Sequence, residues 1–196
     1  MKLSILGCYS ATPRTLNNTT SQVLEINKHM FLIDCGEGSQ VQLRKHKIKF
    51  NRIKHIFISH LHGDHFFGLV GLISTFRLLT READLHIYGP KGIKEVITLQ
   101  MKLADSWTNY NLIFHELTSK DSELIFEDEL VEVFTIPLEH RVYTNVYLFK
   151  EKPGDRKLNI DAVQEEKIDI AYYRKLKQGF DVYNTDGILI KNESVT

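Results

Sequence analysis

The 196-residue chain has only two cysteines, Cys8 and Cys35, and no excess of charge of either sign. Two cysteines are too few for a disulfide scaffold and lack the spacing of a zinc knuckle, so a reducing, cytoplasmic setting is expected. Lys plus Arg number 25 and Asp plus Glu also number 25, which excludes a protein that binds nucleic acid through net charge alone. Any polyanionic substrate must therefore be bound at a local site.

Long hydrophobic runs are absent as well. The most apolar stretch, residues 66–79, has fourteen residues, whereas about 20 are needed to cross a bilayer. The N-terminus has one lysine and a short apolar run that Gly7 interrupts, which is far short of a membrane span. With 42% hydrophobic and 26% charged residues, the chain is expected to be globular, not disordered and not associated with a membrane.

Strand-like and helix-like segments alternate along the chain. Strands are predicted at 3–7, 22–26, 30–35, 55–59, 85–88, 112–116, 124–126, 130–136, 142–149 and 188–190, and helices at 39–45, 66–79, 93–103 and 161–167. The first three strands form an antiparallel meander, which favours an α/β layered sandwich over a doubly wound parallel sheet. Gly68 and Gly71 interrupt the apolar helix 66–79, and their lack of a side chain suggests close packing against the sheet.

Nine histidines are unusual in a chain with one tryptophan, and four good metal ligands fall within six positions, His60, His62, Asp64 and His65. They follow a predicted buried strand and precede a predicted buried helix, and strand ends are where α/β sheets bind their ligands. His60 and His62 can project to the same side of an extended chain, while Asp64 and His65 can turn toward a second point. Imidazole and carboxylate ligands without thiolate suit zinc, with manganese or iron as alternatives.

The alternative interpretation is a polar turn whose histidines face solvent or pack as hydrogen-bonded core residues. It is disfavoured because four such groups at one strand end would repel each other on protonation unless a metal used them. His140 follows the strand 130–136 and is either a distant ligand or a surface residue. The remaining histidines stand alone in strands or charged runs and are interpreted as structural or solvated: His29, His46, His55, His86 and His115.

Three motifs carry a resemblance to a known family: SHLHGDHFFGL at 59–69, FLIDCGEGSQ at 31–40 and LGCYSATP at 6–13. Together with His140-Arg141 and a charged extension, they resemble the metallo-β-lactamase superfamily and, within it, the ribonuclease Z family. The resemblance covers essentially the whole chain. It implies an αββα sandwich and a zinc-dependent endoribonuclease that removes the 3′ trailer from precursor tRNA.

The resemblance also implies a set of site residues. His60, His62 and His140 would hold one zinc ion, Asp64 and His65 would help to hold a second, and Mn²⁺ is possible in their place. Asp64 would also be the catalytic proton acceptor, and Asp34 would orient a ligand or the loop. Two ions roughly 3.5–4 Å apart suit the displacement at a phosphodiester, because they stabilise both the attacking and the leaving oxygen.

The resemblance predicts three segments: a core over 1–149, a protruding tRNA-binding arm over 150–183, and a return strand over 184–196. Between residues 150 and 177 eight Lys or Arg stand against six Asp or Glu, so a solvated surface excursion is the competing interpretation of the arm. If the arm binds tRNA, five residues are expected to contact phosphate or stack on bases: Tyr172, Tyr173, Arg174, Lys175 and Lys177. The implied assembly is a homodimer.

The chain departs from the family pattern in three places. Tyr143 and Val146-Tyr147 replace a proline and a Gly-Tyr pair, and the arm lacks a Gly-Pro turn. The chain also reaches Thr196 before the remaining metal ligands of the family, and no histidine follows His140. We therefore expect the fold to be incomplete at its C-terminus, with an exposed apolar sheet face, and this chain alone to bind at most one zinc well and to hydrolyse phosphodiesters weakly or not at all.

Two other functions remain open. One is a different metal-dependent hydrolase of the superfamily that acts on an ester, thioester or sulfate, which the charged arm disfavours. The other is a truncated, non-catalytic relative that binds tRNA or protein. A dinucleotide site at Gly36-Glu37-Gly38 is disfavoured because the third glycine is missing, and a Cys35 nucleophile is disfavoured because neighbouring carboxylates raise a thiol pKa.

Overall fold

The computed structural model describes residues 1–12 and 14–196 and divides into two compact units, Met1–Glu151 and Lys152–Thr196. The boundary lies two residues after the one expected at 149. Within the described residues, no helix is long and apolar enough to cross a membrane.

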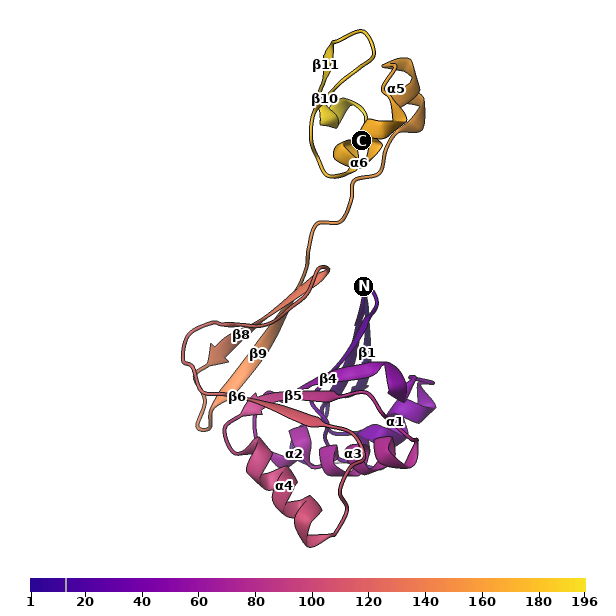
Figure 1. The fold of residues 1–196 in the computed structure, drawn as a ribbon. Coiled ribbons are helices and arrows are strands. Elements are labelled where there is room, and N and C mark those ends of the chain that lie inside the picture. The colour runs from indigo at the N-terminus through magenta and orange to yellow at the C-terminus, as the bar shows by residue number, and fades with distance from the viewer. Residues whose placement is uncertain (13) are drawn as a thin grey trace. The chain divides into compact units, whose positions relative to one another are not determined.

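The first unit is built around a six-stranded mixed sheet (Figure 1). Its strands lie in chain order, β1 (Lys2–Gly7), β2 (Ser21–Ile26), β3 (His29–Ile33), β4 (Ile53–Phe57), β5 (Leu85–Pro90) and β6 (Leu112–Leu117). The strands β1, β2 and β3 pair antiparallel, whereas β3 to β6 pair parallel. The expected opening meander is thus confirmed, and the parallel part is where the carboxyl ends of neighbouring strands meet at one edge.

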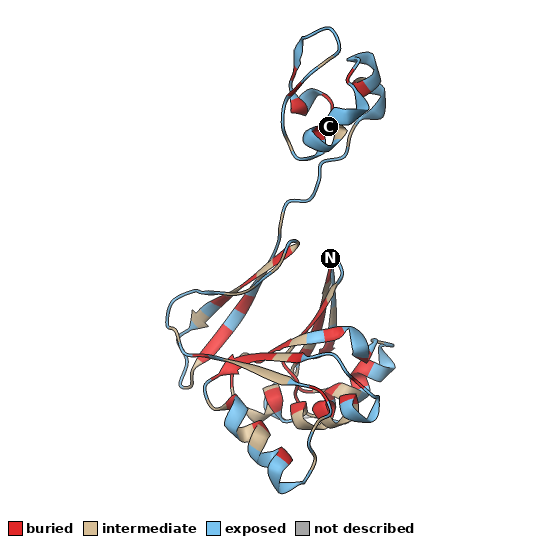
Figure 2. Ribbon diagram, viewed as in Figure 1, coloured by how far each residue is buried: buried red, intermediate tan, exposed pale blue. Residues whose placement is uncertain are grey.

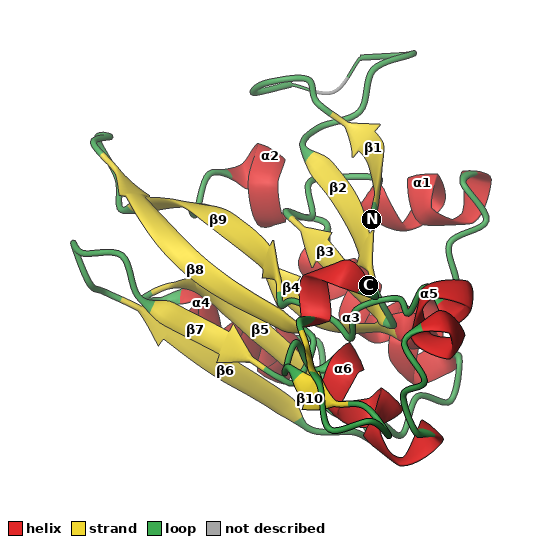
Figure 3. Cartoon of the chain, turned by 90° about the horizontal axis from the view of Figure 1, so that it is seen from above, coloured by secondary structure: helices red, strands yellow, loops and turns green. Residues whose placement is uncertain are grey.

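Three antiparallel strands form a second sheet (Figure 3): β7 (Leu124–Glu127), β8 (Val131–Leu138) and β9 (Thr144–Glu151). It packs on one face of the first sheet through a cluster that includes Phe31, Phe57, Tyr88 and Val133. The helices cover the opposite face (Figure 1): α1 (Ser39–Lys45), α2 (Gly63–Phe66), α3 (Leu69–Leu78) and α4 (Ile93–Leu103). The described residues thus supply three of the four layers of an αββα sandwich.

The outer face of the second sheet is apolar and open to solvent. Buried and exposed residues alternate along β8 and β9 (Figure 2). Ile136 and Val146 are register partners, and together with Leu138 and Leu148 they are 41–47% exposed. This confirms the expected exposed apolar sheet face.

The apolar stretch 66–79 was expected to be one helix, and α3 confirms this over Leu69–Leu78. The start differs, because Phe66 ends the short helix α2 and Phe67-Gly68 separates the two helices. The amide of Gly68 donates to the carbonyl of Cys35 over 2.9 Å, and a Cβ at this position would collide with the backbone of Gly36. The close approach that glycine permits is therefore to the loop after β3, not to the strands themselves. Gly71 makes only ordinary contact with the Gln40 side chain.

The second unit has its own core of buried aliphatic residues, among them Val163, Leu176 and Ile190. It contains α5 (Ile160–Glu165), the 3-10 helix η2 (Ile170–Tyr172), α6 (Tyr173–Lys177), β10 (Val182–Tyr183), β11 (Leu189–Ile190) and η3 (Asn192–Ser194). The strands β10 and β11 pair antiparallel. Residues 184–196, which the sequence suggested as a separate return strand, thus fold together with the arm residues in one unit.

Candidate metal centre

The candidate site lies in the loop between β4 and α2, at the carboxyl end of the parallel strands. Residues of both sheets form hydrogen bonds with the backbone of this loop. The amide of Ile58 donates to the Tyr88 carbonyl over 2.8 Å, and the Ser59 carbonyl accepts from the Asn145 amide over 3.0 Å. The Tyr147 hydroxyl donates to the Ile58 carbonyl over 2.7 Å. These contacts hold the start of the loop, Ile58 and Ser59, against strands of both sheets.

Three histidines meet at this loop. His60, His62 and His140 each place a ring nitrogen so that all three atoms lie within 4.8 Å of one another, and within residues 1–12 and 14–196 they are the one group of three or more such ligands. Nε2 of His60 lies 3.0 Å from Nδ1 of His62. His140 arrives from the loop after β8, 75 or more residues along the chain, so the second sheet supplies the third imidazole. Three converging imidazoles are a donor set that fits zinc.

Ser59 links the histidines to Asp34. Its amide and its hydroxyl contact the two carboxylate oxygens of Asp34 at 2.7 and 3.0 Å. The same hydroxyl lies 3.0 Å from Nδ1 of His60 and 3.1 Å from Nδ1 of His65. A partner at Nδ1 leaves Nε2 free for an ion, which is the usual arrangement around metal-bound imidazoles. No role was expected for Ser59 from the sequence, although it directly precedes His60.

Asp64 and His65, which were expected to help to hold a second ion, lie next to the three histidines but are not part of the converging group. Nε2 of His65 lies 3.5 Å from Oδ2 of Asp64, and the rings of His60 and His65 are 4.0 Å apart. The amide of Ala11 donates to Oδ2 of Asp64 over 2.9 Å, so the loop after β1 positions this carboxylate. The N-terminal segment could not be connected with the site from the sequence.

His60, which is buried, and His65, which is half-buried, differ in their electrostatic surroundings. Burial lowers the pKa of His60 to about 4, and the neighbouring His65 and His62 act in the same direction. Burial also disfavours the charged form of His65, but the hydrogen bond and charge of Asp34, with the charge of Asp64, outweigh it and raise the pKa of His65. His60 is therefore neutral at physiological pH, as a metal ligand must be.

Small residues let the loops around the site approach each other. A Cβ at Gly36 would collide with the Asp64 carbonyl and the Thr19 side chain, so the loop after β3 contacts the metal-ligand loop directly. Asp34 in the same loop has a left-handed backbone, φ 56°, and is only 4% exposed. This conformation directs its carboxylate toward Ser59 and His65.

Comparison with known proteins identifies relatives of this chain. A family model described as "Anti-Pycsar protein Apyc1" matches residues 1–106, and over that stretch the chain belongs to the family it describes. Ribonuclease Z of Bacteroides fragilis is 45% identical over 195 residues, which are 100% of this chain and 64% of that protein. Ribonuclease Z of Bacteroides thetaiotaomicron is 46% identical over 195 residues and 62% of its length. The chain is a ribonuclease Z homologue of the metallo-β-lactamase superfamily.

Solved structures support the fold of this ribonuclease Z homologue. The short form of human tRNase Z (ELAC1) superposes with a TM-score of 0.72 at 35% identity, covering 78% of this chain and 64% of that one. The metallo-β-lactamase fold protein YhfI from Bacillus subtilis superposes with a TM-score of 0.58 at 16% identity. At this identity the similarity is evidence of a shared fold only. The chain spans slightly less than two thirds of the length of the curated relatives it matches first.

The five residues of this chain that were expected to contact tRNA lie on η2 and α6. Tyr172, Arg174, Lys175 and Lys177 are exposed, and the Lys175 ammonium lies 5.7 Å from the centroid of the Tyr172 ring. Tyr173 instead packs against the core of the second unit, so it is less able to contact a ligand than the other four.

The other candidate groups lie outside the metal centre. Cys35 is fully buried, and burial raises the pKa of its thiol to about 12, which agrees with the expectation that it is not a nucleophile. His46 is exposed at the end of α1. The remaining four histidines line the interface between the two sheets or its edge, in ring contact with one another and with aromatic residues: His29, His55, His86 and His115.

Proposed function

We propose that this chain provides the metal-binding part of a zinc-dependent endoribonuclease that removes the 3′ trailer from precursor tRNA. The observation that carries the proposal is the convergence of His60, His62 and His140 in a chain whose whole length aligns with 64% of a ribonuclease Z. The Apyc1 model stops at residue 106, whereas the ribonuclease Z relatives extend through the arm. The longer alignment favours RNA processing over another hydrolase activity of the superfamily.

In this proposal His60, His62 and His140 hold one zinc ion, and Asp64 with His65 contributes to a second, with Mn²⁺ as an alternative. Bound divalent ions would supply charge stabilisation at the scissile phosphodiester. Asp34 acts through His65 and Ser59, whose contacts with it fix the orientation of the ring. The Ala11 amide holds Asp64, which serves as the proton acceptor.

The described residues offer unequal ligand sets to the two proposed ions. One ion would have three imidazoles, whereas the other would have only one carboxylate and one imidazole. A structural zinc ion has four protein ligands and a catalytic one has three. We therefore infer that this chain alone binds one zinc ion well at most and cleaves precursor tRNA weakly or not at all. The exposed residues of α6, with Tyr172, are proposed to bind the tRNA body, in a cytoplasmic homodimer.

Zinc content and tRNA cleavage test the proposal together. The chain is loaded with zinc, dialysed and analysed for metal, and is then assayed with a precursor tRNA that carries a 3′ trailer. We expect about one zinc per chain in the wild type, much less in His60→Ala, and no change in His46→Ala, which removes an exposed histidine outside the site. Two zinc ions per chain with turnover of precursor tRNA would refute the inference that only one ion binds well. A zinc content in His60→Ala equal to that of the wild type would refute the proposed metal site.

A further inference from the structure

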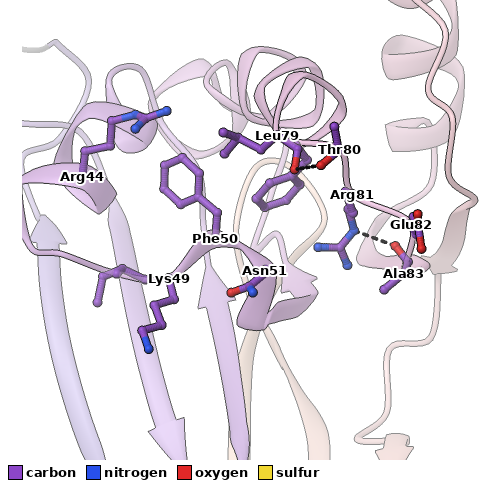
Figure 4. Close-up of a pocket in the computed structure, with 11 residues that line it drawn as sticks. Arg44, Lys49, Phe50, Asn51, Leu79, Thr80, Arg81, Glu82 and Ala83 are labelled. Carbon is purple, nitrogen blue, oxygen red and sulfur yellow. Dashed lines mark hydrogen bonds between the residues drawn. The ribbon is translucent and has the colours of Figure 1, made fainter.

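Strand β4, which leads into the metal loop, is held at both ends by a buried side chain that donates to a backbone carbonyl. At the amino end, after the 3-10 helix η1 (Phe50–Arg52), Arg81 donates to the carbonyl of Ile53 over 2.9 Å. Its other two guanidinium nitrogens donate to the carbonyls of Ala83 and Asp84, beside a cavity of about 790 Å³ (Figure 4). Because all three nitrogens of Arg81 bind backbone carbonyls, this residue fixes the start of the strand.

The side chain that holds the carboxyl end of the strand is Tyr147 of β9. Its ring is buried, with its centroid 5.1 Å from that of the Phe57 ring, and its hydroxyl donates to the carbonyl of Ile58 over 2.7 Å. Burial raises the pKa of Tyr147 well above its usual value, and the charges of Asp34 and Tyr143 act in the same direction. The hydroxyl therefore stays protonated at neutral pH and remains a donor.

The peptide group between Ile58 and Ser59 is bound on both of its polar sides. Its carbonyl accepts from Tyr147, and its N–H donates to Oδ1 of Asp34 over 2.7 Å. Oδ2 of the same carboxylate lies 2.7 Å from Nδ1 of His65. A continuous series of hydrogen bonds thus runs from the second sheet, through one peptide group and one carboxylate, to an imidazole of the candidate metal centre. Hydrogen bonds in such a series polarise and strengthen one another.

We propose that Tyr147 is a positioning residue of the metal centre, which acts on the ligands through the peptide group before Ser59 and through Asp34. The hydroxyl fixes the plane of this peptide group and so directs its N–H toward the carboxylate. The Ser59 side chain is thereby kept in contact with Nδ1 of His60. The inference rests on the metal site proposed above and extends it to β9, a strand whose own residues are not in the ligand group.

Tyr143, close to Tyr147 in the chain, offers a matched comparison. Its hydroxyl also donates to a backbone carbonyl, that of Ser119, over 2.8 Å, but Ser119 lies in the connection between β6 and β7, outside the metal loop. Tyr143→Phe and Tyr147→Phe each remove one oxygen atom and one hydrogen bond and keep the ring. The general cost of a lost hydroxyl should therefore be similar in the two variants.

Zinc titration of the wild type and these two variants tests the proposal. We expect Tyr147→Phe to weaken zinc binding about tenfold, the lower end of the effect of residues that orient metal ligands, and Tyr143→Phe to leave the zinc affinity unchanged. Urea unfolding without metal should show similar losses of stability in both variants. Co²⁺ in place of zinc gives visible absorption bands that depend on the ligand geometry, and these bands should shift in Tyr147→Phe alone.

A double-mutant cycle with Asp34→Asn shows whether the effect passes through Asp34. Asparagine has one acceptor oxygen and cannot join the peptide N–H to His65, so in this background Tyr147→Phe should change the zinc affinity less than about twofold. Additive effects, a wild-type zinc affinity in Tyr147→Phe, or equal losses in Tyr147→Phe and Tyr143→Phe would each overturn the inference and leave the metal site standing. Absence of zinc binding in the wild type would refute the metal site of the proposed function and the inference with it.

Discussion

Nδ1 of His65 lies 2.7 Å from Oδ2 of Asp34. The contact joins the loop after β3 to the loop after β4 and leaves Nε2 of His65 facing Asp64. Asp34 also accepts hydrogen bonds from the amide and hydroxyl of Ser59. One buried carboxylate therefore orients both His65 and the serine that contacts His60.

Asp34→Asn is expected to reduce zinc affinity about 10- to 100-fold, because partners of metal-bound imidazoles contribute that much in other sites. The asparagine has nearly the same shape but lacks the charge that favours the ring orientation. Isothermal titration with zinc measures the change. Asp128→Asn is the matched control, since Asp128 also contacts a histidine, His29, at 2.6 Å and lies outside the cluster. Unchanged zinc affinity in Asp34→Asn would show that this carboxylate does not orient the ligands.

Two glycines of the same helical region should respond oppositely to alanine. Gly68→Ala would place a methyl group against the Gly36 backbone, and we expect a loss of about 2–3 kcal/mol in the free energy of unfolding. Gly71→Ala faces the flexible Gln40 side chain at ordinary contact distance and should gain up to about 1 kcal/mol from helix propensity. Urea unfolding followed by fluorescence of Trp107, the one tryptophan, reports on the first unit. Equal effects would contradict the close approach at Gly68.

The sequence was sufficient for the elements whose periodicity is strong and for the ligands that are close together. The opening meander and the helix at 39–45 follow from the hydrophobic pattern. A metal site is indicated by the close spacing of four ligand residues, His60, His62, Asp64 and His65. The break of the helix 66–79 depends instead on a backbone contact between Gly68 and Gly36. Such contacts between distant segments leave no periodic signal, and the same is true of the Ala11 amide that holds Asp64.

The histidines outside the metal centre are a second case in which pattern was uninformative. His55 and His86 occupy paired positions of β4 and β5, and their rings stack at 4.9 Å. His86 in turn lies 3.1 Å from His115 on β6. Each was interpreted alone as structural or solvated, whereas strand register brings them together in a row under the second sheet.

This row predicts a pH dependence of stability. Burial lowers the pKa of His55 to about 3, and the charges of four neighbours add to the effect: His86, His29, His115 and Lys54. The unfolded chain takes up a proton near pH 6.5, so the stability that the neutral ring contributes is present above that pH and is lost as the pH falls toward 3. The loss should reach about 2 kcal/mol at pH 5.

His55→Phe should flatten the decline between pH 6.5 and pH 5 by about one proton, because phenylalanine keeps the ring contacts with Phe31 and Phe126 but cannot titrate. Urea unfolding of the wild type and variant at several pH values, followed by Trp107, measures the slope. His46→Gln, which changes an exposed histidine, should leave the slope unchanged. An unaltered slope in His55→Phe would mean that His55 does not account for the acid sensitivity.

The last prediction concerns the arm. Arg174 and Lys175 are exposed cations on α6, next to the exposed ring of Tyr172. If they contact tRNA phosphates, the double variant Arg174→Gln, Lys175→Gln should weaken tRNA binding by roughly tenfold at 0.1 M salt and lower the slope of log affinity against log salt by about two. Filter binding of the full chain at several salt concentrations measures both. The double variant Lys45→Gln, Lys47→Gln removes the same charge from the first unit. If both double variants weaken binding equally, the attraction is a property of net charge, and the arm residues have no specific part in it.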